Sequence, residues 1–356
     1  MSTLAATNLK HASSASNNIV LDSSGNATFA GTPVPGSSFL RNRIINGNMY
    51  IAQRATSATV TAGTGVPTAS TGYPAVDRFF AYSTGANVTA AQVSGAGSNR
   101  NLFRITGAAS VTAVGVGQRI EAVNSYDLAG QTCTLSVDLA NSLLTTVTWT
   151  ANYATTTDTF GTIGTPTKTQ IATGTFTVSS TLTRFSANIS VPAAATTGIE
   201  ILFTVGAQTS GTWDIGNVQF EAGTAATPFE RRQYGQELAL CQRYYQSAGS
   251  GAFGGFDGST STTIQITEKL IVDMRTAPTA SIRSGVNAAF RSTGADYTAT
   301  SPGLANFSSQ TNAIGSGIAF WTQVTGFTGG TSNAVVNSRN QVATNGGAFI
   351  NLSAEL

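Results

Sequence analysis

The sequence predicts an all-β protein of many short antiparallel strands, and three observations lead to this prediction. Charged residues make up only 10% of the 356 residues, whereas an ordinary soluble domain carries about a quarter. Hydrophobic residues reach 41%, which distinguishes the chain from the apolar-poor, highly charged sequences of disordered proteins. The 38 glycines and the many Ser, Thr and Asn residues supply turns between short strands.

The clearest strand pattern lies at 132–140, where apolar and polar residues alternate. Its apolar positions are Cys133, Leu135, Val137 and Leu139, and its polar positions are Thr132, Thr134, Ser136 and Asp138. The same alternation recurs at 185–191 and 199–205. Because no helical periodicity interrupts residues 40–232, these strands predict a two-sheet sandwich, most typically a jelly roll.

Residues 1–39 are predicted to form an attachment arm. Apolar residues at 18–22 and 27–29 flank a Ser-Gly-Asn turn, which predicts a small hairpin, and Pro33, Pro35 and Gly36 form a linker. A lone hairpin is marginally stable in water. We therefore expect this arm to dock on a partner surface.

The segment 233–247 carries the one clear helix pattern and connects two domains. Its apolar residues lie on more than one side of the helix, so three copies packed around an axis would bury them. The candidates for a trimer interface are Leu238, Leu240, Cys241, Tyr244 and Tyr245. A glycine-rich break at 247–255 follows, and residues 248–356 return to alternation, which predicts a C-terminal β-sandwich domain.

Several classes of function are excluded by composition. His11 is the only histidine and lies in a polar segment, which argues against Ser-His-Asp or Cys-His catalysis and against histidine-rich metal sites. Cys133 and Cys241 are too few for a closed zinc site and are expected to be buried free thiols. The 18 Lys and Arg residues are scattered among 16 Asp and Glu, so no nucleic-acid partner is expected.

No apolar run is long enough to cross a bilayer and no signal peptide is evident at residue 1. We therefore expect no membrane insertion, and no cofactor. The adjacent charges Asp77-Arg78 and Glu230-Arg231-Arg232 predict structural ion pairs, within one chain or between subunits, because a buried unpaired charge is costly.

Segments of the chain resemble a family of bacteriophage tail fibre and receptor-binding proteins that contain a jelly-roll domain similar to carbohydrate-binding modules. The segments that carry the resemblance are 41–49, 53–54, 73–79, 118–121, 126–131, 213–232, 237–245 and 274–279. The resemblance covers roughly residues 40–280. The chain beyond residue 285 matches no sequence motif of the family, as expected for a receptor-binding tip that differs between fibres.

The resemblance implies a homotrimeric fibre of the virion tail, made in the host cytoplasm, that recognises a host surface polysaccharide. Residues 1–39 would attach it to a baseplate or tail protein, 40–232 would form the jelly roll, and 248–356 would bind the receptor. Whether a metal ion sits in the jelly roll stays open. Two alternatives remain: a capsid decoration or head-fibre protein without a receptor role, and a capsule-degrading tailspike.

The aromatic residues supply the candidate glycan-binding positions, which are Trp149, Tyr153, Tyr297, Trp321 and Phe327. On one strand, Trp149 and Tyr153 would lie about 13 Å apart on the same face; we favour a core position because large aromatic side chains are mostly buried. Trp321 has the opposite parity to Phe320 and Val324, so it would lie on a glycan site or a subunit interface. The isolated acidic residues show no pair spaced for glycoside hydrolysis, and we expect no enzyme activity.

Overall fold

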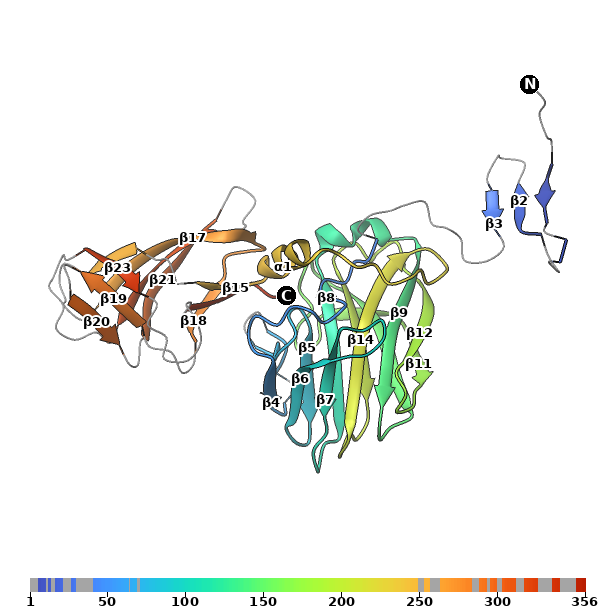
Figure 1. Ribbon diagram of the computed structural model, residues 1–356, viewed down its shortest axis with the longest axis horizontal. Coiled ribbons are helices and arrows are strands. Elements are labelled where there is room, and N and C mark those ends of the chain that lie inside the picture. The colour runs from blue at the N-terminus through green and yellow to red at the C-terminus, as the bar shows by residue number, and fades with distance from the viewer. Residues whose placement is uncertain are drawn as a thin grey trace, which may run out of the picture.

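A computed structural model describes residues 6–10, 12–13, 17–21, 27–29, 41–63, 65–68, 71–248, 253–256, 263–283, 288–292, 295–299, 303–311, 317–325, 335–339 and 350–356. Figure 1 shows a large β-sandwich, a short helix and a smaller β unit beside it. Among the helices within these ranges, none has the length and hydrophobicity needed to cross a bilayer.

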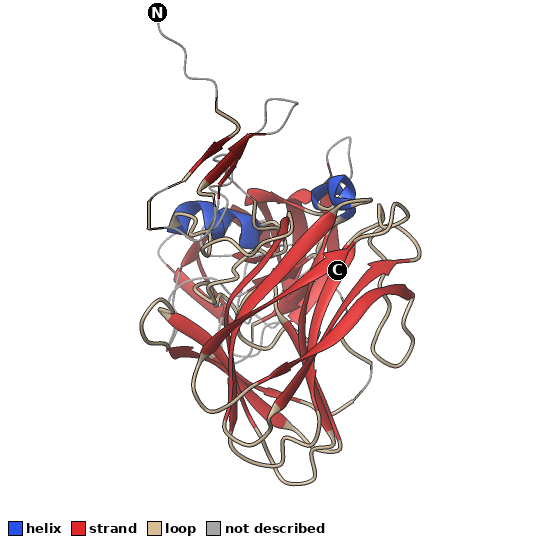
Figure 2. Ribbon diagram, turned by 90° about the vertical axis from the view of Figure 1, so that its right-hand side faces the viewer, coloured by secondary structure: helices blue, strands red, loops and turns tan. Residues whose placement is uncertain are grey.

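Two antiparallel sheets form the jelly roll, which confirms the predicted fold class. The five-stranded sheet has the order β11-β10-β13-β8-β5, with bounds Lys168–Thr177, Thr146–Ala154, Ile199–Val205, Ala113–Ile120 and Phe80–Thr84. The six-stranded sheet has the order β12-β9-β14-β7-β6-β4, with bounds Thr183–Ser190, Thr132–Asn141, Thr212–Ala222, Asn101–Thr106, Val88–Ser94 and Ser57–Val60. Figure 2 shows the helical segments near one end of these strands.

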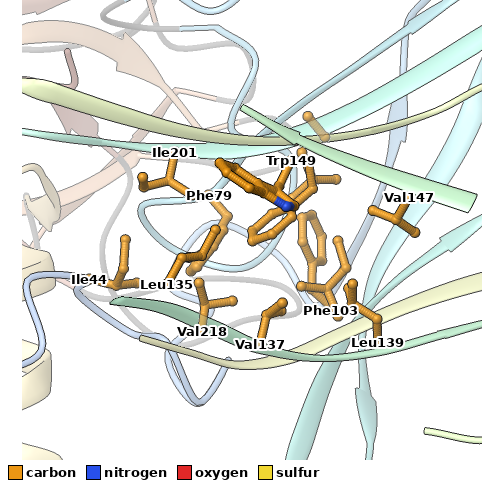
Figure 3. Close-up of a cluster of buried hydrophobic side chains, with 14 of the residues drawn as sticks. Ile44, Phe79, Phe103, Leu135, Val137, Leu139, Val147, Trp149, Ile201 and Val218 are labelled. Carbon is orange, nitrogen blue, oxygen red and sulfur yellow. The ribbon is translucent and has the colours of Figure 1, made fainter. Parts of the chain in front are cut away.

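The core lies between the two sheets and follows the sequence alternation. All four apolar residues of the β9 pattern, Cys133 to Leu139, are fully buried. Figure 3 shows Leu135, Val137 and Leu139 facing Val147, Trp149 and Ile201 from the opposite sheet. Trp149 is 7% exposed, so it is a core residue and offers no platform for a glycan.

The N-terminal region contains a three-stranded sheet of β1 (Asn8–Leu9), β2 (Ile19–Leu21) and β3 (Ala27–Phe29). The pairing of Ile19 with Phe29 confirms the expected hairpin. The pairing of Asn8 with Val20 adds a third strand, which the short polar sequence did not indicate.

The C-terminal unit consists of a three-stranded and a seven-stranded sheet. The first has the order β15-β24-β18, with bounds Tyr245–Ala248, Ile350–Ser353 and Thr279–Ile282. The second has the order β20-β19-β23-β16-β17-β22-β21, with bounds Ala295–Ala299, Ala288–Ser292, Val335–Arg339, Phe253–Phe256, Ile264–Met274, Gly317–Thr325 and Gly303–Thr311. The buried core of this unit draws residues from both sheets and includes Ile266, Phe320, Val324, Ile350 and Leu352.

The connecting helix is shorter than the sequence pattern suggested. Helix α1 spans Tyr234–Gln242, and the chain already continues as strand β15 at Tyr245. Two short 3₁₀ helices, η1 (Ala122–Asn124) and η2 (Tyr126–Leu128), lie within the jelly-roll chain. Strand β15 ends at Ala248, so it spans the domain boundary expected between residues 247 and 248.

The residues expected at a trimer interface lie mostly inside one chain. Cys241, Tyr244 and Tyr245 are at most 4% exposed, and Leu238 and Leu240 pack against the same cluster as Cys241. The apolar sides of the helix are covered by neighbours that are distant in sequence: Ile45, Ile51, Phe160 and Leu356. We therefore assign these five residues to the junction between the two units of a single chain.

A buried ion pair joins the two units at this junction. Arg78 and Glu355 form an ion pair in which both side chains are at most 1% exposed. The Arg78 guanidinium lies 3.4 Å from the ring centre of Tyr244 and donates a 2.7 Å hydrogen bond to the Arg119 carbonyl. Glu355 also accepts a 3.0 Å hydrogen bond from Arg54. The two charges are thus taken out of water together.

Further polar contacts fix the segment 353–356 against the jelly roll and helix α1. Arg119 donates to the main-chain oxygen of Leu356 at 2.7 Å, and the Tyr73 hydroxyl donates to the same oxygen at 3.0 Å. Arg275 donates to the carbonyls of Ala354 and Glu355 at 2.9 and 3.0 Å. This segment is therefore held by both units.

Three of the five adjacent charges in the sequence, Asp77, Arg78 and Arg232, form ion pairs within the chain. Arg78 pairs with Glu355 rather than with its neighbour Asp77, and Arg232 lies 3.3 Å from Glu237. Asp77 accepts hydrogen bonds from Gln53. Burial raises the pKa of Asp77, and Arg54, 3.9 Å away, opposes the rise. The prediction of structural ion pairs is confirmed for Asp77, Arg78 and Arg232, with partners that no local sequence pattern identifies.

We predict that Glu355→Gln lowers the free energy of unfolding by about 3 kcal/mol or more, because it leaves the buried Arg78 without a counter-charge. Urea denaturation of the whole chain measures this loss. The matched control is Asp127→Asn, since Asp127 pairs with Arg43 at the surface and is 44% exposed. This control should cost less than about 1 kcal/mol. Equal effects of the two variants would contradict the role given to Glu355.

Candidate functional site

The five candidate glycan-binding residues do not form one site in the described structure. Trp149 is in the core, and Tyr153 is half-buried and packs against that core. Trp321 and Tyr297 lie on strands β22 and β20, but their side chains are outside the described part of the structure, as is the whole of Phe327. Their role in ligand binding stays a prediction.

A polar pocket on the outer face of the six-stranded sheet is one of two candidate sites in the described residues. We call it the Asp138 pocket and define it by Asn99, Asp138, Arg184, Asn217 and Phe229. Its volume is about 730 Å³, a size typical of small-ligand sites. Asp138 belongs to the polar, outward-facing half of the β9 alternation.

Strand register brings the polar residues of the pocket together. Arg184 on β12 is directly opposite Asp138 on β9, and Gly216 on β14 is opposite Asp138 from the other side. The register of β14 then shifts between Gly216 and Gln219. Asn217 lies in this irregularity with a φ of 43°, so the bulge turns its side chain toward Asp138.

Asp138 is held by three donor side chains. Its Oδ2 accepts hydrogen bonds from Asn99 Nδ2 at 2.7 Å and from Asn217 Nδ2 at 2.9 Å, while its Oδ1 accepts from Arg184 at 3.0 Å. Arg184 also donates to the Asn217 carbonyl at 2.7 Å and to Ser136 Oγ at 2.6 Å. The arrangement is fixed by the protein before any ligand arrives.

Gly216 is required by the close approach of Asn99. A Cβ at residue 216 would lie 2.4 Å from Asn99 Oδ1 and 2.6 Å from Leu102 Cδ2, both far inside van der Waals contact. Asn99 is 4% exposed, and its Oδ1 has no hydrogen-bond partner in the described structure.

The segment that follows β14 forms the apolar wall of the pocket and covers the rest of this face. Thr227 donates to Glu221 through both its main-chain nitrogen and its hydroxyl, and the main-chain nitrogen of Glu230 donates to Gln219. Phe229 and Pro228 therefore lie over the sheet and line the pocket beside Leu182. The pocket is the part of the polar face that this segment leaves open.

These groups suit a ligand rich in hydroxyl groups. A carboxylate, two amides and a guanidinium offer donors and acceptors in fixed planes, and Phe229 and Pro228 offer an apolar surface to the faces of a ring. Asp138 is the only carboxylate among the lining residues, whereas glycoside hydrolysis uses a pair. Across the described ranges, no cluster of three or more His, Cys, Asp or Glu side chains is placed to bind a metal.

One signal for this site is present in the sequence. Asp138 is the charged member of the polar half of a strand pattern, and a charge in a chain this poor in charges indicates a partner or a ligand. Its contacts Asn99, Arg184 and Asn217 are 39, 46 and 79 residues away. Only the register of the sheet could bring them together.

A second cavity, of about 720 Å³, lies where the two units meet. Arg54, Tyr73, Tyr245 and Asn351 are among its lining residues. The Tyr245 hydroxyl donates a hydrogen bond to Asn351 Oδ1 at 2.7 Å. The centre of the Tyr245 ring lies 3.9 Å from the Arg54 guanidinium, and Arg54 in turn pairs with Glu355. Because these polar groups already hold the junction together, we assign the cavity to the junction and the ligand site to the Asp138 pocket.

Comparison with known proteins finds no matching family model and no matching curated sequence. Among solved structures, a CBM4 module shares 13% identity at a TM-score of 0.34, over 50% of this chain and 98% of that one. A family 11 carbohydrate-binding module from Clostridium thermocellum, in complex with a tetrasaccharide, shares 14% identity at a TM-score of 0.29. The match covers 49% of this chain and 99% of that one. The enzymatically active domain of bacteriophage CBA120 tailspike protein 4 shares 16% identity at a TM-score of 0.31. The match covers 51% of this chain and 22% of that one. These likenesses are distant, and no assignment below rests on them.

We predict that Gly216→Ala lowers the free energy of unfolding by about 1–3 kcal/mol, because the added methyl group must displace Asn99 or Leu102. Urea denaturation measures the loss. Gly206→Ala is the matched control, since nothing lies within 4 Å of a Cβ at residue 206. It should change stability by less than about 1 kcal/mol. If the two variants were equally stable, Asn99 would not be confined as described.

Proposed function

We propose that the chain is a structural virion protein, a bacteriophage tail fibre that binds a host surface polysaccharide as a homotrimer. The observation that carries the binding role is the Asp138 pocket, a preorganised set of planar polar groups beside a half-buried phenylalanine on an open sheet face. Its chemistry fits sugar rings, which combine vicinal hydroxyl groups with apolar faces. The single carboxylate in the pocket supports binding without hydrolysis.

The resemblance to tail fibres is carried by residues that build the junction. Arg78, Glu121 and Glu237 belong to the resembling segments, and each makes a buried or half-buried ion pair there. A framework of this kind suits a rigid fibre, because it couples the jelly roll to the unit beyond it. The three-stranded sheet before residue 41 suits docking on a tail or baseplate protein.

The trimer is supported by exposed sheet edges rather than by the helix. Strands β11 and β12 lie at the ends of their sheets, and most of their residues are exposed or half-buried. Such edges present unpaired main-chain groups to other chains. Association of three copies would cover them and would raise avidity for a repeating polysaccharide.

We predict that the purified full chain has the mass of three chains in light scattering at micromolar concentration. The physical reason is the pair of long, uncovered edge strands. A species with the mass of one chain, 36.4 kDa, would contradict the trimer but would leave the binding role of the pocket intact.

We predict that Phe229→Ala weakens polysaccharide binding about five- to tenfold, because it removes the aromatic wall against which a sugar ring packs. Titration calorimetry with soluble fragments of a retained host polysaccharide measures the change for each site. The control is Tyr126→Ala, which removes another aromatic ring, 61% exposed and outside the pocket. Its affinity should equal that of the unmodified chain.

Equal affinity of the Phe229→Ala variant and the unmodified chain would argue against the pocket as the binding site. The polysaccharide should also be recovered without new reducing ends. Their appearance would favour the alternative function, a capsule-degrading tailspike. Antibody labelling of the head rather than the tail in intact particles would favour a head fibre or capsid decoration protein.

A further inference from the structure

The charges beside the Asp138 pocket do not cancel. Asp138 is neutralised by Arg184 at 3.0 Å, but Arg231 also lines the pocket and is exposed. Its guanidinium donates to the main-chain oxygen of Ser98 and lies 5.4 Å from the ring centre of Phe229. In the described structure, no carboxylate lies within ion-pair distance of Arg231.

A second cation without a counter-charge, Arg100, follows the turn that carries Ser98, although it is not among the residues that line the pocket. Arg100 is two residues beyond Ser98, a stretch of chain that spans at most about 7 Å. Its guanidinium lies 4.9 Å from the ring centre of Tyr50. Like Arg231, it is exposed and has no carboxylate within ion-pair distance among the residues described.

An aromatic pair, a half-buried Tyr50 and an exposed Tyr234, continues the surface from Arg100. Tyr50 and Tyr234 meet edge to face with ring centres 5.2 Å apart, and Tyr234 is 54% exposed. Exposed rings of this kind offer a face to sugar rings and a hydroxyl group to their substituents. The turn 95–100 thus connects a polar pocket with an aromatic and cationic surface.

Arg100 and Arg231 are exceptions, together with Arg283 on the C-terminal unit, because most arginines of the described structure are neutralised. Ten of them form ion pairs: Arg41, Arg43, Arg54, Arg78, Arg104, Arg119, Arg184, Arg232, Arg243 and Arg275. Arg231 in the pocket wall and Arg100 at the end of the turn 95–100 therefore add uncompensated positive charge to this region of a protein with a net charge of only +2. Such a field favours an anionic ligand.

We infer that the ligand of the Asp138 pocket is an acidic polysaccharide, whose anionic groups bind Arg231 and Arg100. This inference rests on the proposed function and names the class of its substrate. The pocket holds a sugar ring through its hydroxyl groups, and the arginines bind carboxylate or phosphate groups on that ring and its neighbour. Guanidinium groups suit both anions, since they donate two parallel hydrogen bonds.

An array of bacterial surface polysaccharides tests the inference with the full chain. It contains uronate-containing, phosphate-containing and neutral polymers of similar length. Acidic polymers should be retained at least about tenfold more tightly than neutral ones. Retention should weaken as sodium chloride rises from about 0.05 to 0.5 M, because the screening length falls severalfold. Comparing the uronate and phosphate polymers identifies the anion.

Charge-removing variants locate the effect. Arg100→Gln and Arg231→Gln should each weaken binding of the retained acidic polymer about three- to tenfold. Lys269→Gln removes the same charge from an exposed position on the C-terminal unit and should leave affinity unchanged. Arg231→Lys keeps the charge but not the two parallel hydrogen bonds, so its affinity should lie between those of Arg231→Gln and the unmodified chain.

The outcomes distinguish this inference from the proposed function. Retention of neutral polymers, with affinities unaffected by either arginine variant, would overturn the acidic class and leave polysaccharide binding standing. Retention of no polymer at all would overturn both. Equal losses in the Lys269→Gln control and the arginine variants would show a general charge effect and would contradict the assigned contacts.

Discussion

The buried ion pair between Arg78 and Glu355 is the interaction on which the arrangement of this protein depends. Moving two charges out of water costs several kcal/mol for each ion, and only close contacts on all sides offset it. Here the Tyr244 ring covers the guanidinium, and Arg54 gives Glu355 a second cation. Because Glu355 directly follows strand β24, the same pair holds the C-terminal sheet against the jelly roll. The position of one unit relative to the other therefore follows from these buried polar groups together with the apolar cluster around Cys241, Tyr244 and Leu356.

The binding surface arises from a different feature, the alternation of polar and apolar residues along β9. Its apolar half builds the core, and its polar half leaves Ser136 and Asp138 on the outer face of the sheet. The segment after β14 crosses this face and covers Gln219 and Glu221, but it leaves Asp138 beside an open pocket. The apolar residues that form the core and the polar residues that line the pocket thus lie on opposite faces of the same strands. A ligand on the outer face needs no opening of the sandwich, which is consistent with a rigid recognition protein.

Period-two patterns carried enough information to predict the sandwich, the N-terminal hairpin and the burial of Cys133 and Trp149. They could not place the end of the helix, because Arg243 and Tyr244 are compatible with a helix, and the turn there is set by the pairing of β15 with β24. They also could not assign Arg78 to Glu355, 277 residues away. The residues expected at a trimer interface were misassigned for the same reason: their apolar surfaces are covered by Ile45, Ile51 and Leu356, which no local pattern links to the helix.

Hydrogen exchange of the full chain, with and without a saturating amount of a retained polysaccharide, tests the central claim most directly. The account predicts that main-chain amides at 95–100, 181–184 and 229–231 become protected on binding, while those at 279–281 in the junction do not change. Protection confined to the junction cavity or to the seven-stranded sheet of the C-terminal unit, with none around Asp138, would contradict the account.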